Sequence, residues 1–188
     1  MEGSGLIRRQ VVAALAWQLA LLVGIGLIAI GASGAVALSM RAVFGDRFVA
    51  GDPQGVAYTA ERCADYLEYV PGAADCEAAA SAHRADEVVF DRITAGLLGG
   101  CVLAGCWWLA RRRDGWDEAG RPSPQVLPAI GTALFGAAAF VLGVQGIGVL
   151  VFEGPDRGPG QWMSAGAVSL VVFVGFARAF WHSLLTAP

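Results

Sequence analysis

Four long stretches of the chain contain no charged residue. They are Gln10–Met40, Ile93–Ala110, Pro122–Phe152 and Gly158–Ala177, with 31, 18, 31 and 20 residues. A helix needs about 20 apolar residues to cross the roughly 30 Å hydrocarbon core of a bilayer. Only helices and closed barrels satisfy their backbone hydrogen bonds in lipid, and these stretches do not alternate as barrel strands do. The pattern predicts four transmembrane helices, at about 11–40, 91–110, 126–152 and 162–184.

The first stretch has some features of a secretory signal peptide. Arg8 and Arg9 precede it, and Ala35-Val36-Ala37 resembles a cleavage site. However, its apolar run is about twice the 7–15 residues that are usual in a signal peptide. We therefore expect an uncleaved helix, with removal of this segment as the alternative.

The arginines predict the orientation of the spans. All 13 basic residues are arginine, and together with the abundant Ala, Gly and Val this favours a GC-rich bacterial genome. Basic residues in short segments beside spans stay in the cytoplasm. An arginine within the last span, near its inner edge, can extend its side chain to the interface. We expect a multi-pass protein of the bacterial plasma membrane, with both termini cytoplasmic and anchored by Arg8, Arg9, Arg111, Arg112, Arg113 and Arg178.

The expected fold class is all-α: a four-helix membrane bundle with an extracytoplasmic helical hairpin between its first two spans. The segments outside the spans are a cytoplasmic N-terminus (1–10), an acidic outer segment (41–90), a cytoplasmic loop (111–125), a short outer loop (153–161) and a cytoplasmic tail (185–188).

The outer segment holds nine acidic residues and three arginines between positions 42 and 90. Glycines and an Asp-Pro pair predict a loop over Phe44–Gly55. Thr59 is a candidate cap for a helix that ends near Val70, before the Pro71-Gly72 turn. A second helix begins near residue 75 and meets no helix breaker before about residue 110, so its first turns stand above the membrane.

Two cysteines, Cys63 and Cys76, flank the Pro71-Gly72 turn. Two helices folded back at this turn bring them together, in a compartment where disulfides persist. We expect a structural disulfide that stabilises the fold by about 3 kcal/mol; a redox pair and free thiols are the alternatives. Cys101 and Cys106 lie five residues apart on the second span, so they point to different faces, and we interpret them as small buried apolar residues.

One stripe of candidate ligands lies at the outer membrane surface, where the second span begins. His83, Glu87 and Asp91 recur every four residues and therefore share one face of a helix. An imidazole with two carboxylates can bind a divalent metal or relay protons. We interpret the stripe as a solvated or partner-facing surface, which Arg84 and Arg92 partly neutralise, and keep the metal or proton site as the alternative.

Small residues predict where the second span packs. Gly96, Gly100 and Ala104 form a small-x-x-x-small stripe, a pattern that allows helices in lipid to approach closely. We expect this packing to occur within the chain; contact with another subunit is the alternative.

Composition narrows the class of protein. Hydrophobic residues make up 56% and charged residues 15%, against about 25% charged in soluble domains, and the net charge is −3. These values argue against a soluble, disordered or nucleic-acid-binding chain. The sequence has no phosphate-binding glycine motif and no carboxylate within the four charge-free stretches. Its two histidines are predicted on opposite sides of the membrane, so we expect no haem, and we predict no cofactor.

These observations favour a non-catalytic accessory or assembly subunit of a larger membrane complex. Its expected partners are the lipid bilayer and other membrane-protein subunits or further copies of itself, and not nucleic acid. The alternatives are a self-associating channel or transporter, and a membrane enzyme that uses the His83 stripe or the Cys63 and Cys76 thiols.

Overall fold

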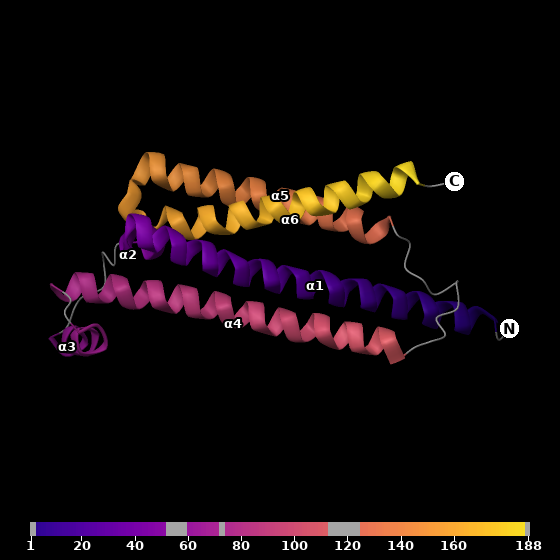
Figure 1. Ribbon diagram of the computed structural model, residues 1–188, viewed down its shortest axis with the longest axis horizontal. Coiled ribbons are helices and arrows are strands. Elements are labelled where there is room, and N and C mark those ends of the chain that lie inside the picture. The colour runs from indigo at the N-terminus through magenta and orange to yellow at the C-terminus, as the bar shows by residue number, and fades with distance from the viewer. Residues whose placement is uncertain (1–2, 52–59, 72–73, 113–124, 187–188) are drawn as a thin grey trace.

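The computed structural model describes residues 3–51, 60–71, 74–112 and 125–186, and these residues are helical with short connections and no strand (Figure 1). The elements in chain order are α1 (Gly3–Phe44), α2 (Asp46–Ala50), α3 (Ala60–Tyr69), α4 (Cys76–Arg112), α5 (Val126–Gly148), the π-helix η2 (Val149–Glu153), the 3-10 helix η3 (Pro155–Arg157) and α6 (Pro159–Leu185).

Four of these helices are long and apolar enough to cross a membrane. The apolar spans are Ala14–Phe44, Cys76–Leu109, Val126–Glu153 and Pro159–Leu185. Many large apolar side chains on these helices point outward, an arrangement that is unfavourable in water. Leu97, Phe140 and Val171, for example, are 69%, 72% and 72% exposed. Four helices that are long and apolar enough to span a membrane are therefore present, as the charge-free stretches predict.

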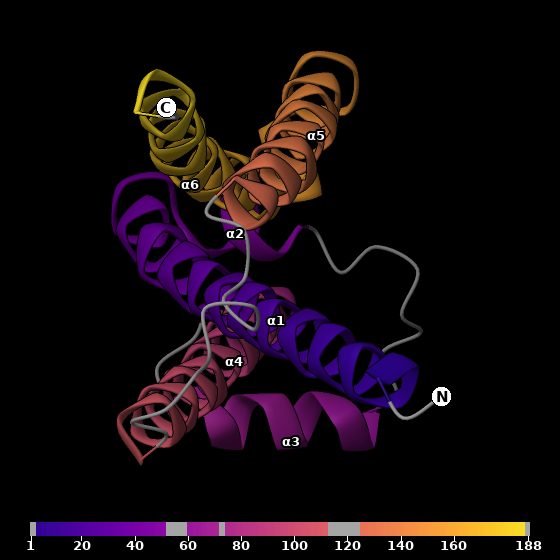
Figure 2. The same ribbon diagram turned by 90° about the vertical axis from the view of Figure 1, so that its right-hand side faces the viewer.

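The long helices form an open row rather than a ring. Helix α1 lies between α4 and α6, and α5 packs on the other side of α6 (Figures 1 and 2). Helix α3 runs crosswise to them and packs against α4 (Figure 2). The start of α1 and the end of α6 lie at one end of the molecule, and α2 and α3 lie at the other, which we call the α2 end (Figure 1).

A small cluster of buried apolar residues lies at the α2 end. Phe48 and Val49 of α2 are buried against α1, α4 and α6. The full cluster comprises Ala37, Phe48, Val49 and Val89, with Met40, Leu150 and Met163 packed against it. The loop predicted over Phe44–Gly55 is thus wrong for Asp46–Ala50. Burial of Phe48 and Val49 favours a short helix at this point. The helix lies between two glycines with positive φ that do interrupt helical structure, Gly45 (φ +90°) and Gly51 (φ +80°).

Helices α1 and α4 approach until their backbones touch. A Cβ atom on Gly31 would lie 2.5 Å from the Cα of Gly96, and one on Gly99 would lie 2.8 Å from the carbonyl oxygen of Gly24. By contrast, a Cβ on Gly100 would meet nothing within 4 Å, and Ala104 is exposed. The predicted stripe is therefore split: Gly96 packs within the chain, while Gly100 and Ala104 face outward.

Candidate functional site

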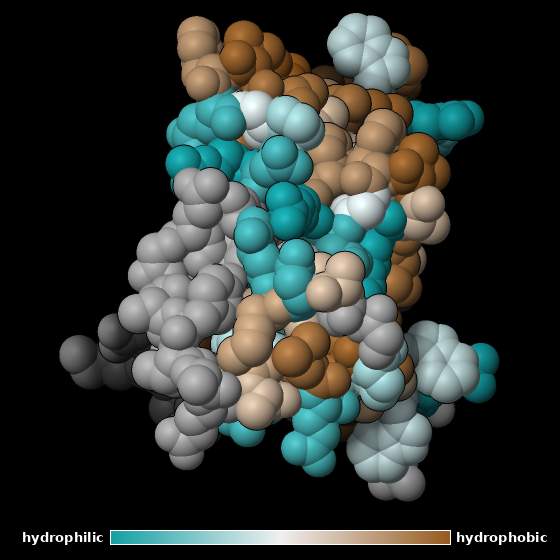
Figure 3. Space-filling model, turned by 90° about the vertical axis from the view of Figure 1, so that its left-hand side faces the viewer, coloured by the Kyte–Doolittle hydropathy of each residue, from teal (hydrophilic) through white to brown (hydrophobic). Residues whose placement is uncertain are grey.

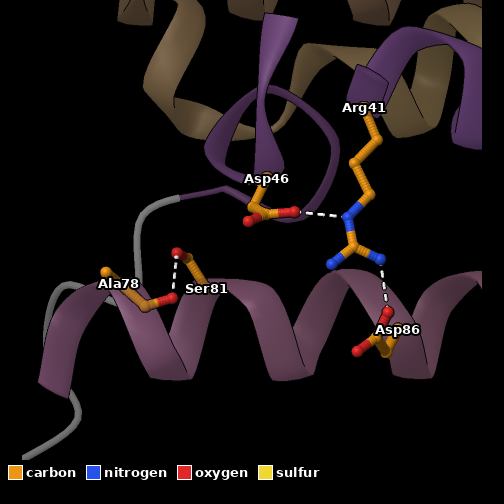
Figure 4. Close-up of polar contacts among 5 residues, drawn as sticks. All are labelled: Arg41, Asp46, Ala78, Ser81 and Asp86. Atoms are coloured by element: carbon orange, nitrogen blue, oxygen red, sulfur yellow. Dashed lines mark hydrogen bonds and ion pairs between the residues drawn. The ribbon is translucent and has the colours of Figure 1, made fainter. Parts of the chain in front are cut away.

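Ion pairs join three helices at the α2 end. Arg41 of α1 pairs with Asp46 of α2 and with Asp86 of α4 (Figure 4). Arg47 of α2 pairs with Glu77 of α4 at 3.1 Å. All five side chains are partly exposed, so each pair contributes about 1 kcal/mol or less. Their main effect is to fix the position of α2 over the ends of α1 and α4.

A disulfide holds α3 on α4. Cys63 and Cys76 are bonded, with their Cα atoms 5.4 Å apart, as the spacing around the turn predicts. The two remaining cysteines are free and point to different faces of α4, with Cys101 exposed and Cys106 buried. The prediction that both are buried is therefore wrong for Cys101. Thr59, the candidate cap of α3, lies outside the described residues.

The disulfide places two tyrosines of α3 beside His83 of α4. The ring centroids of Tyr69 and His83 are 4.4 Å apart and meet edge to face, and those of Tyr66 and His83 are 5.6 Å apart. The Nδ1 atom of His83 is buried without a hydrogen-bond partner among the described residues. The tertiary fold therefore turns this histidine toward the two tyrosines of α3.

Two shallow hollows share this aromatic cluster. The larger, of about 440 Å³, runs along α4 and is lined by Tyr69, His83, Asp86, Glu87, Val89, Phe90 and Ile93. The smaller, of about 340 Å³, is lined by Asp65, Tyr66, Tyr69 and His83. Seen end-on from the α2 end, hydrophilic side chains gather toward the middle of the described surface (Figure 3).

The stripe of His83, Glu87 and Asp91 does not gather into a metal centre. Glu87 and Asp91 are exposed, whereas His83 is half-buried against the tyrosines. Within the described ranges no three His, Cys, Asp or Glu side chains come close enough to hold a metal ion. The metal alternative for this stripe has no geometric support.

Arg92 has a role that the sequence did not reveal. Instead of neutralising the acidic stripe, its guanidinium crosses to α6, donating to the Ser164 hydroxyl at 2.8 Å and to the Gln161 carbonyl at 3.0 Å. Ser164 is completely buried. No carboxylate of the described residues lies within ion-pair distance of Arg92. The position of Arg92 directly before a charge-free stretch indicated that this arginine is unusual. Only the tertiary structure shows that its side chain points toward α6.

The arginines predicted as anchors are only partly described. Arg111 stacks on the Trp107 ring, 3.9 Å from its centroid, at the end of α4 opposite to the α2 end. Arg178 is exposed in the last part of α6. The side chains of Arg8, Arg9, Arg112 and Arg113 lie outside the described part of the chain.

The chain was compared with protein families, curated proteins and solved structures, and none of the three comparisons gives a match.

Proposed function

We propose that the chain is a non-catalytic accessory or assembly subunit of a larger membrane complex. The open row of helices carries this proposal. Helices α4 and α5 stand at the two ends of the row, and each packs along its length against one long neighbour, α1 or α6 (Figure 2). Such a row leaves whole helix faces for the spans of another subunit, which would complete the predicted bundle.

The free face of α4 suits close contact with another helix. Gly100, Cys101, Ala104 and Gly105 are all exposed, and they follow the i, i+1, i+4, i+5 spacing of one helix face. A Cβ atom on Gly100 or Gly105 would meet nothing within 4 Å. Association of helices in lipid depends on van der Waals packing, which small residues improve by letting backbones approach.

The proposal places the protein in a bacterial plasma membrane with the α2 end outside. Two features support this orientation. Arg111 lies at the opposite end of α4, as expected for a cytoplasmic boundary. The Cys63–Cys76 disulfide lies near the α2 end, as expected for an oxidising compartment. In this placement α3 and the first turns of α4 form the extracytoplasmic hairpin.

The test is affinity purification of the tagged chain from its native membrane in a mild detergent, followed by mass spectrometry. Gly100→Leu adds bulk on the free face of α4 without an intrachain clash. Gly175→Leu adds the same bulk at an equally open position on α6 and is the matched control. We expect stoichiometric heteromeric partners that Gly100→Leu reduces at least about fivefold and Gly175→Leu retains.

Other outcomes would overturn the proposal. A homo-oligomer that conducts solutes in liposomes would identify the channel alternative. A monomer without stoichiometric partners would remove the subunit assignment. A catalytic activity lost in His83→Ala or Cys63→Ser, with the fold intact, would identify the enzyme alternative.

A further inference from the structure

The larger hollow along α4 has two chemically different ends. Tyr69 and His83 line its first part, Glu87 its middle, and Phe90 and Ile93 its last part. Ten residues of helix separate His83 from Ile93, which corresponds to about 15 Å. The apolar part leads into the charge-free stretch of α4, which begins at Ile93. A ligand lying in this groove would have an aromatic and acidic surface at one end and the lipid at the other.

The aromatic end leaves ring surface exposed. Tyr69 and His83 meet edge to face, at an interplanar angle of 74°, and not as a stacked pair. Parts of the ring faces therefore remain available, and Tyr69 is 56% exposed. The negative faces of aromatic rings attract organic cations, and quaternary ammonium groups are bound in this way by clusters of such rings.

The charged groups near the groove also favour a cation. Asp86 is already neutralised by Arg41. Asp65 and Glu87 have no basic group within 4.0 Å among the described residues. No arginine lines either hollow. Glu87 lines the larger hollow, and Asp65 lines the smaller one, which shares Tyr69 and His83 with it. A carboxylate without a counter-ion on each side of these rings favours a ligand with a net positive charge.

We propose that this groove binds an amphiphilic organic cation, in which an ammonium head carries an apolar chain. The head lies against Tyr69 and the Glu87 carboxylate, and the chain follows Phe90 and Ile93 toward the bilayer. This site goes beyond the assembly role and is tested with other residues. The groove lies on the same side of α4 as Gly100 and Cys101 but nearer the α2 end.

The test uses the full chain in a non-ionic maltoside detergent and measures binding by titration calorimetry. Octyltrimethylammonium is the main probe. Tetramethylammonium lacks the chain, octyl glucoside lacks the charge, and a short-chain phosphatidylcholine adds a phosphate. We expect saturable binding of one octyltrimethylammonium per chain, with tetramethylammonium at least about tenfold weaker and octyl glucoside without saturation.

Variants connect the binding to this groove. Glu87→Gln and Tyr69→Leu are expected to raise the dissociation constant about three- to tenfold each. Glu153→Gln and Phe140→Leu change the same kinds of side chain at exposed positions elsewhere and should leave it unchanged. Glu87→Gln keeps the size of an exposed side chain, so it remains informative if Tyr69→Leu fails to fold.

The outcomes either support or overturn the site. Tighter binding of octyltrimethylammonium than of the phosphatidylcholine identifies a free amphiphilic cation, and the reverse identifies a lipid headgroup as the source of the ammonium. Equal saturation by octyl glucoside would overturn the requirement for charge. Binding that Glu87→Gln and Tyr69→Leu leave unchanged would overturn the location.

Discussion

At the scale of single residues, Arg92 shows how burial redirects a charge. It precedes the charge-free stretch of α4 by one residue, where a cation is costly unless hydrogen bonds satisfy it. Ser164 and the Gln161 carbonyl provide two acceptors from α6. Arg92 thus connects α4 with a helix that is not its main packing partner.

Removing this connection should weaken the fold modestly. Arg92→Gln loses both hydrogen bonds to α6, and interhelical hydrogen bonds in membranes contribute about 1 kcal/mol. We expect the free energy of unfolding in mixed micelles to fall by about that amount. Arg157→Gln changes an exposed arginine of η3 and should have no effect. Equal stability of the two variants would contradict the role given to Arg92.

At the scale of elements, the contact between α1 and α4 depends on missing side chains. Gly31 and Gly96 face each other so closely that neither position has room for a Cβ atom. Gly100, one turn further along α4, has open space around it. Two glycines of one helix therefore differ in function although their sequence spacing is the same as in a single packing stripe.

This difference is testable with one substitution at two positions. Gly96→Val forces the two backbones apart and should cost about 1–3 kcal/mol of unfolding free energy. Gly100→Val makes the same change in helix propensity without a clash. Unfolding of the isolated chain in micelles measures both. A larger loss for Gly100→Val would show that the helix faces are assigned incorrectly.

The disulfide also determines how firmly helix α3 is held on α4. The packing partner of α3 is α4, to which the disulfide ties it. Cys63→Ser with Cys76→Ser should therefore destabilise the α3 attachment by about 3 kcal/mol, the value for a loop of this length. We expect faster proteolysis of α3 while α1, α4, α5 and α6 stay intact. Cys101→Ser, which removes a free thiol, is the control and should not change the rate.

At the scale of the whole molecule, the structure consists of two helix pairs that contact each other mainly through one helix of each pair. The pairs α1 with α4 and α5 with α6 contact each other through α1 and α6 and, at one end, through α2. The ion pairs, the small cluster of buried apolar residues and Arg92 all lie toward this end. The other ends of the two pairs diverge (Figure 1).

The proposed orientation of the whole molecule has a direct test. A protease-sensitive tag at either terminus should be spared in intact spheroplasts and cut after lysis. Asp156→Cys places a thiol on exposed η3 near the α2 end, and a membrane-impermeant maleimide should label it from outside. Cleavage of either terminal tag in intact cells, or labelling of Asp156→Cys only after lysis, would contradict the orientation.

The amino-acid sequence alone was sufficient to predict four membrane helices, because length and absence of charge decide whether a segment can enter lipid. It also predicted the Cys63–Cys76 pair from the turn between them. It was not sufficient to predict the short helix α2, the target of Arg92 or the packing face of α4. Within their charge-free stretches the long helices are apolar on all sides, so no polar face marks which side packs against protein. That choice depends on complementary surfaces, such as Gly31 against Gly96, that become visible only when two helices are brought together.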